Sequence, residues 1–207
     1  MTADNKDAAA DIAWMRRLAE EGAETPMQGA SVLMSAGLIY GGASLVHWAQ
    51  LAGVFPVDGV PIGIGWLAAT GLFLLSLALI LPRLGRSGGV MTAGNRASAT
   101  VWSALGWGVF ALFLSMAALG WRMGEQGALM AMSLAISAIM VFYGIGWAVT
   151  AAMHKSRRLW GLAIGSFVAA PILAALAGTS EQYLAYAAAL FLLMALPGFL
   201  LMRGARR

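Results

Sequence analysis

The chain has 207 residues, of which 60% are hydrophobic and 11% are charged, and its mean hydropathy is +0.78. This leaves too little polar surface to cover a water-soluble globule, so the composition excludes one and predicts a protein embedded in lipid. The net charge of +4 lies mainly in short segments beside apolar runs, which argues against nucleic-acid binding, and the absence of cysteine excludes disulfides and thiolate metal sites.

Residues 1–26 form a polar N-terminal segment with a linker. They carry six acidic residues and lack the apolar core of a secretory signal peptide, so no cleavage is expected. Within them, residues 5–22 are predicted to form a short amphipathic cytoplasmic helix that ends at Gly22. Its negative charge favours docking on the basic loops of the same chain, and a protein partner is the alternative.

Six long apolar segments follow, and each is close to the length of about 20 residues that a membrane-spanning helix needs. Backbone polar groups must be satisfied within lipid, and the apolar runs are continuous rather than alternating, so helices are favoured over a barrel. The predicted fold class is therefore all-α, a bundle of six transmembrane helices preceded by the N-terminal helix. The predicted spans are 27–51, 62–82, 99–121, 127–153, 159–177 and 181–202. They form a transmembrane domain of residues 27–203, and a basic tail, residues 203–207, follows it.

Helix-start signals refine two of these boundaries. Pro61 is suited to the first turn of the second span, because the missing N–H of proline is not needed there. Thr179 with Gln182 resembles a capping box that opens the last span.

Basic residues predict the orientation of the spans. Twelve of the thirteen Lys and Arg residues fall before span one, between spans two and three, between spans four and five, or after span six, and Arg122 is the exception. Because Lys-rich and Arg-rich short loops stay in the cytoplasm, both termini are predicted to be cytoplasmic. The Ala-rich and Gly-rich composition without cysteine is typical of a multi-pass protein of the bacterial inner (plasma) membrane.

Polar side chains on the first span form the candidate ligand site. Gly37, Tyr40, Ser44 and His47 recur at steps of three and four residues, so they share one helix face. Tyr40, Ser44 and His47 are the candidate ligand-binding residues of a groove open to the outer side. The alternative is a packing face whose polar groups bond to neighbouring helices.

Two small-residue motifs predict close helix contacts. Gly37 and Gly41, and likewise Gly161 and Gly165, are separated by three residues and let helix backbones approach one another. Packing within the bundle is the favoured interpretation, and homo-oligomer formation through either face is the alternative.

The interiors of the spans contain no Asp, Glu, Lys or Arg, which argues against an ion-coupled transporter or pump. No catalytic residue, cofactor or metal is predicted, and the bilayer is the expected partner. The favoured function is a non-enzymatic accessory, regulatory or stress-related one that acts through the cytoplasmic face. A transporter or channel for a neutral or apolar small molecule is the alternative. A membrane enzyme is the second alternative, and it would use His47 with the outer acids Asp58, Glu125 and Glu181.

Overall fold

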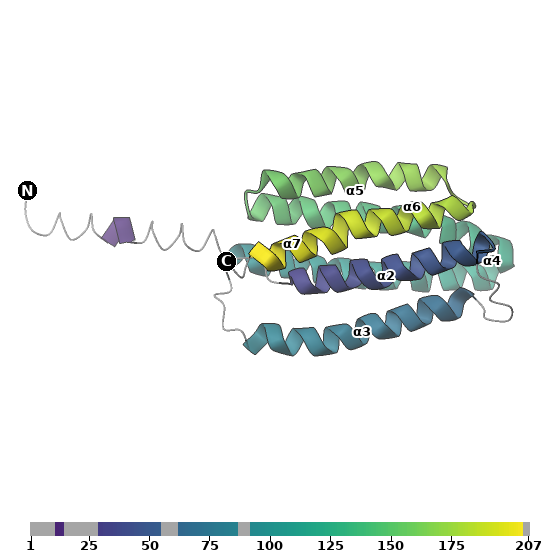
Figure 1. The fold of residues 1–207 in the computed structure, drawn as a ribbon, viewed down its shortest axis with the longest axis horizontal. Coiled ribbons are helices and arrows are strands. Elements are labelled where there is room, and N and C mark those ends of the chain that lie inside the picture. The colour runs from purple at the N-terminus through teal and green to yellow at the C-terminus, as the bar shows by residue number, and fades with distance from the viewer. Residues whose placement is uncertain (1–10, 15–28, 55–61, 87–91, 205–207) are drawn as a thin grey trace, which may run out of the picture.

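A computed structural model of the protein describes residues 11–14, 29–54, 62–86 and 92–204 (Figure 1), without the side chains of Arg86 and Glu125. Of the expected N-terminal helix, residues 11–14 are helical, and the remainder lies outside the described residues, as does Asp58. Ile12 and Trp14 are 63% and 64% exposed, so this short helical piece does not bury its apolar side chains.

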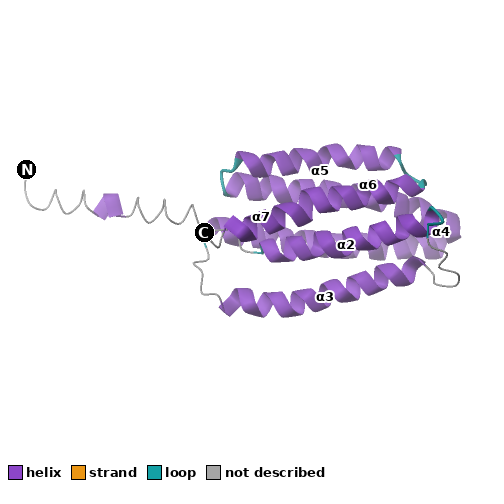
Figure 2. Ribbon diagram, in the orientation of Figure 1, coloured by secondary structure: helices purple, strands orange, loops and turns teal. Residues whose placement is uncertain are grey.

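All elements of the described bundle are helical (Figure 2). They are α2 (Ala30–Leu51), α3 (Ile62–Arg86), α4 (Ala93–Met153), α5 (Arg157–Ala175), α6 (Ser180–Leu190), the π-helical turn η1 (Phe191–Ala195) and α7 (Leu196–Gly204). The last three form one span, whereas α4 contains two spans, Ala93–Gly124 and Gln126–Met153. In the described part of the chain, six helices are thus long and apolar enough to cross a membrane, which confirms the predicted fold class.

The joint between spans three and four differs from the expected loop. Only Gly124 departs from helical geometry within α4, with a φ of 72° and a ψ of −164°, a backbone conformation that glycine adopts readily. The start of α4 is also earlier than predicted. Thr92 caps it, because its hydroxyl oxygen accepts a hydrogen bond from the backbone N–H of Asn95 at 3.2 Å.

The predicted capping box at the start of α6 is wrong. The Thr179 hydroxyl donates to the Leu176 carbonyl, and the fully buried Gln182 points away from its own helix end. Gln182 Nε2 donates to the carbonyls of Ser133 at 2.8 Å and Leu173 at 3.0 Å. Leu173 lies in the last turn of α5, where carbonyls lack helical partners, so Gln182 satisfies that end and ties three spans together.

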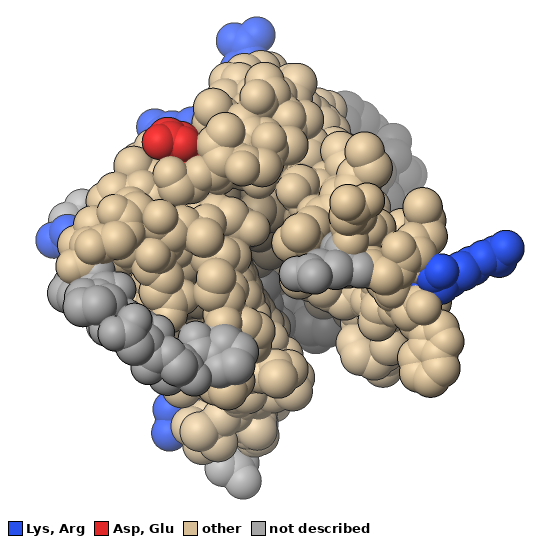
Figure 3. Space-filling view, turned by 90° about the vertical axis from the view of Figure 1, so that its right-hand side faces the viewer, with Lys and Arg blue, Asp and Glu red and all other residues tan. Residues whose placement is uncertain are grey.

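The helices form two groups. In the first, α2 packs against α3 on one side and against α6, η1 and α7 on the other; in the second, α4 packs against α5. The groups meet where α5 contacts α6 and η1, and α3 lies at the edge of the bundle (Figure 1). Among the described helices, α3 has extensive contacts only with α2. Figure 3 shows the end of the bundle opposite the start of α2 and the end of α7, and this end is hollowed between two lobes.

The contact between α2 and the last span depends on glycine. A Cβ at Gly37 would lie 2.9 Å from the Ala195 Cα, and one at Gly41 would lie 2.7 Å from the Phe191 ring. A Cβ at Gly198 would lie 2.6 Å from the backbone nitrogen of Met34. This small-residue face is therefore filled within the chain. In contrast, a Cβ at Gly161 would meet nothing within 4 Å, and one at Gly165 would lie 3.0 Å from Leu193 Cδ2. Homo-oligomer contact through the Gly37/Gly41 or the Gly161/Gly165 face stays a prediction.

Candidate functional site

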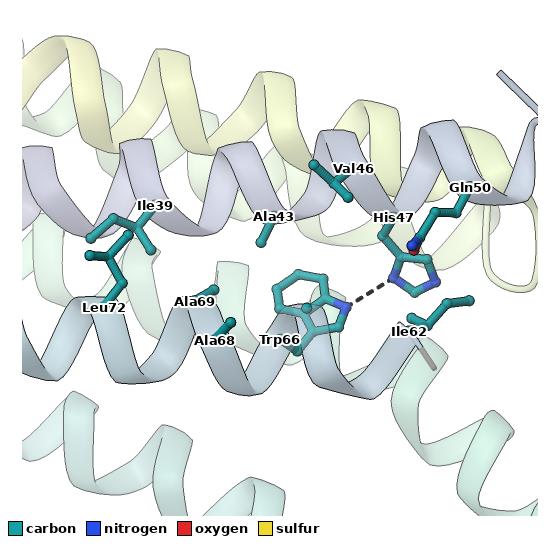
Figure 4. Close-up of a pocket in the computed structure, with 11 residues that line it drawn as sticks. Ile39, Ala43, Val46, His47, Gln50, Ile62, Trp66, Ala68, Ala69 and Leu72 are labelled. Carbon is teal, nitrogen blue, oxygen red and sulfur yellow. Dashed lines mark hydrogen bonds between the residues drawn. The ribbon is translucent and has the colours of Figure 1, made fainter. Parts of the chain in front are cut away.

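His47 lies at a groove between α2 and α3 (Figure 4). The groove has a volume of about 270 Å³. Its walls are apolar except for His47, Gln50 and Trp66, and no charged side chain lines it. The lining residues are Ile39, Ala43, Val46, His47, Gln50, Ile62, Gly65, Trp66, Ala68, Ala69 and Leu72.

The His47 ring is held by two aromatic neighbours. Its Nδ1 accepts a hydrogen bond from the indole Nε1–H of Trp66 at 3.0 Å (Figure 4). On its other side, the ring centroid lies 3.7 Å from that of Tyr183, with the planes inclined by 34°. Because Nδ1 accepts, neutral His47 carries its proton on Nε2, so the imidazole can offer one further hydrogen bond as a donor.

The other two predicted ligand residues lie elsewhere on α2. Ser44 is fully buried and its hydroxyl donates to the Tyr183 carbonyl at 2.8 Å, so it joins α2 to α6. The Tyr40 ring packs on that of Phe73, with centroids 5.4 Å apart. Of the three predicted residues, only His47 lines the groove. Ligand binding at Tyr40, Ser44 and His47 stays a prediction.

Sequence reasoning missed Gln50 and Trp66 as polar groups of the groove. Gln50 follows His47 by three residues, so the helical repeat places both on one face of α2 and could have revealed it. Trp66 belongs to another span, and nothing in the local pattern of either helix indicates that its indole meets His47. Within the described part of the chain, no group of His, Asp and Glu side chains could hold a metal ion.

The other end of the bundle, where α2 begins and α7 ends, carries positive charge. It holds the basic side chains of Arg83, Arg96, Lys155, Arg157, Arg158 and Arg203, all near helix ends at this side of the bundle. His154 lies there too, as the C-terminal cap of α4, and its Nε2 is buried without a hydrogen-bond partner. Burial lowers the pKa of His154, because the imidazolium form would be desolvated. The described basic side chains, Arg122 excepted, therefore lie together at one end of the bundle, as the charge asymmetry of the sequence predicts.

Six apolar helices of spanning length define a multi-pass membrane protein. No protein-family model, curated protein or solved structure matches the chain.

Proposed function

We propose that this multi-pass membrane protein is a non-catalytic binding or transport protein that takes a neutral, largely apolar small molecule into the α2–α3 groove. The observation that carries the proposal is an apolar groove of about 270 Å³ with a hydrogen-bond donor fixed at one end. That volume lies just below the range of about 300–1,000 Å³ usual for small-molecule pockets, which favours a small compound or one segment of a longer chain.

The lining supports a neutral ligand. No acidic or basic side chain borders the groove, so a charged ligand would lose its hydration without gaining a counter-ion. His47 and Gln50 lie on one turn of α2, and the rest of the wall is aliphatic apart from Trp66. A hydroxyl or carbonyl group beside His47, with an apolar body along Ala43, Ala69 and Leu72, matches this distribution.

Filling the groove tests the proposal. In nanodiscs, a long-chain alcohol carrying a photoreactive diazirine is expected to label groove residues of the wild-type protein, and Ala43→Leu is expected to reduce this labelling. Overpacking costs about 1–3 kcal/mol, so occupancy should fall by roughly five- to 150-fold. Mass spectrometry of the labelled peptides gives the measurement.

Ala78→Leu is the matched control. Ala78 is an exposed residue of α3 that does not line the groove, so the same increase in size should leave groove labelling unchanged. Equal labelling in wild-type and Ala43→Leu protein would rule out the groove as the binding place.

An accessory function through the N-terminal segment is the second candidate. Ile12 and Trp14 are exposed in the described part of this segment, so both apolar side chains are available for contact with a protein partner. The double substitution Ile12→Ser with Trp14→Ser is expected to release a co-purifying protein partner in quantitative mass spectrometry and to leave groove labelling intact. Retention of the same partner at the same stoichiometry would contradict this role.

A further inference from the structure

The α2–α3 groove has a polar end and an apolar end. Figure 4 shows His47, Gln50 and Ile62 at one end of the groove, and Ile39 with Leu72 at the other. Gln50 lies in the last turn of α2, whereas Ile39 lies near the middle of that helix. The polar end is therefore at the surface of the bundle away from the basic side chains, and the groove runs inward from there.

The length of the groove matches one leaflet of a bilayer. Ile39 and Gln50 are eleven positions apart, which at a rise of about 1.5 Å per residue is about 16 Å of helix. Half of a hydrocarbon core about 30 Å thick is about 15 Å. The groove thus extends from the membrane surface to the bilayer midplane, the depth that one acyl chain occupies.

The groove is open to the side. Val46 of α2 and Leu72 of α3 line it from facing helices and are 55% and 54% exposed. Among the described helices, α3 has extensive contacts only with α2, so no other span covers it. Exposed side chains of a membrane span contact lipid tails rather than water. A lipid can therefore enter the groove laterally, without leaving the bilayer.

The polar end offers fixed hydrogen-bond donors. His47 is 9% exposed, and Trp66 and Tyr183 hold its ring in place. Within the described part of the chain, no group accepts a hydrogen bond from His47 Nε2–H or from the amide of Gln50. A carbonyl oxygen has two lone pairs and can accept from both. The ester carbonyls of glycerolipids lie at this depth, between the headgroups and the hydrocarbon core.

We propose that the groove binds one acyl chain of an ester-linked glycerolipid from the leaflet on that side, with the ester carbonyl accepting hydrogen bonds from His47 and Gln50. The chain lies along Ala43 and Ala69 and ends near Leu72. The headgroup stays in water beyond the groove, so its charge does not meet the uncharged walls. This inference rests on the proposed function, because it names the ligand class of the same groove.

Photolabelling of the full chain in nanodiscs tests where the acyl chain lies. A phosphatidylcholine and a diacylglycerol each carry one diazirine, either next to the ester or at the end of the acyl chain. The first position should label peptides at Gln50 and Ile62, and the second those at Ile39 and Leu72. Labelling in this order by phosphatidylcholine identifies a phospholipid as the source of the chain, and labelling by diacylglycerol alone identifies an uncharged glyceride.

Exchange of the ester for an ether tests recognition of the carbonyl. In competition with the labelled probe, the ester lipid should bind the wild-type protein more tightly than its ether analogue, roughly two- to 13-fold for each hydrogen bond accepted. Gln50→Leu should lose one such factor. The double variant His47→Phe with Trp66→Phe should also lose one, because it removes the imidazole donor and the indole N–H that could replace it.

Two variants serve as controls. Trp66→Phe alone keeps the His47 donor and should keep the preference for the ester. Ser115→Ala removes an exposed hydroxyl that bonds to its own helix at Ala111, outside the groove, and should bind both lipids as the wild-type protein does. A variant that loses ester and ether binding together has lost its fold, and the wild-type comparison then decides alone.

The failure of this inference is distinct from failure of the proposed function. If the long-chain alcohol labels the groove but neither glycerolipid does, the groove binds another class of ligand and only the glycerolipid assignment is overturned. Equal competition by ester and ether on the wild-type protein, or the same labelled peptides for both diazirine positions, also overturns it. Absence of groove labelling by the alcohol and by both lipids overturns the two proposals together.

Discussion

Substitution of Gly37 by alanine should destabilise the bundle by about 3 kcal/mol, at the upper end of the cost of overpacking. The added Cβ would lie 2.9 Å from both the Cα and the Cβ of Ala195 and would also clash with the Ala195 backbone nitrogen. Backbone atoms cannot rotate away as a flexible side chain can, so α2 must separate from the last span. Thermal unfolding in detergent, followed by circular dichroism or by intrinsic tryptophan fluorescence, measures the loss.

Gly42→Ala is the matched control on the same helix. A Cβ at Gly42 would meet nothing within 4 Å, and alanine has the higher helix propensity by about 1 kcal/mol. This variant should be as stable as the wild-type protein or slightly more stable. If Gly37→Ala and Gly42→Ala unfold at the same temperature, the close contact between α2 and η1 is not formed.

Replacement of Trp147 by phenylalanine is expected to destabilise the protein by about 3 kcal/mol, the sum of a cavity and an unpaired carbonyl. Trp147 is fully buried, and its indole Nε1–H donates to the Leu193 carbonyl at 3.0 Å. Pro197 lies four residues after Leu193 and has no N–H, so it cannot make the usual helical bond to that carbonyl. The indole takes the place of the missing donor.

Trp147 and Pro197 are therefore expected to be energetically coupled. In a Pro197→Ala background, residue 197 regains an N–H that can donate to Leu193, so Trp147→Phe should cost about 1 kcal/mol less than in the wild-type background. Trp160→Phe, at a residue 45% exposed, serves as the control and should have little effect. Equal costs of Trp147→Phe in both backgrounds would show that the indole does not compensate for the proline.

The fold was predictable because lipid imposes strong and simple requirements. Continuous apolar length fixes the number of spans, and no water is present to satisfy a backbone in any open irregular form. The boundaries were less accessible. The chain between spans three and four was expected to form a loop, yet one glycine conformation at Gly124 is sufficient, and Thr92 extends α4 toward its N-terminus beyond the apolar run.

The candidate site was only partly predictable. The repeat of three and four residues placed Tyr40, Ser44 and His47 on one face of α2, but it could not say which helix each would meet. Ser44 meets α6, whereas His47 meets both Trp66 of α3 and Tyr183 of α6. Likewise, the local spacing of Thr179 and Gln182 is that of a capping box, but Gln182 donates hydrogen bonds to carbonyls of two other spans. Tertiary packing decides which partner each side chain meets, and the local sequence pattern carries no signal of that packing.

The single-glycine joint within α4 also explains the one basic residue that departs from the charge asymmetry. Arg122 lies two positions before Gly124, at the end of the bundle away from the other described basic side chains. With no intervening loop, the two halves of α4 form a tight helical hairpin, and such a hairpin inserts as a unit. In the orientation that the loop charges predict, the hairpin carries Arg122 across the membrane near its tip, where covalent linkage to two strongly apolar spans outweighs the preference of a lone positive charge for the cytoplasmic side.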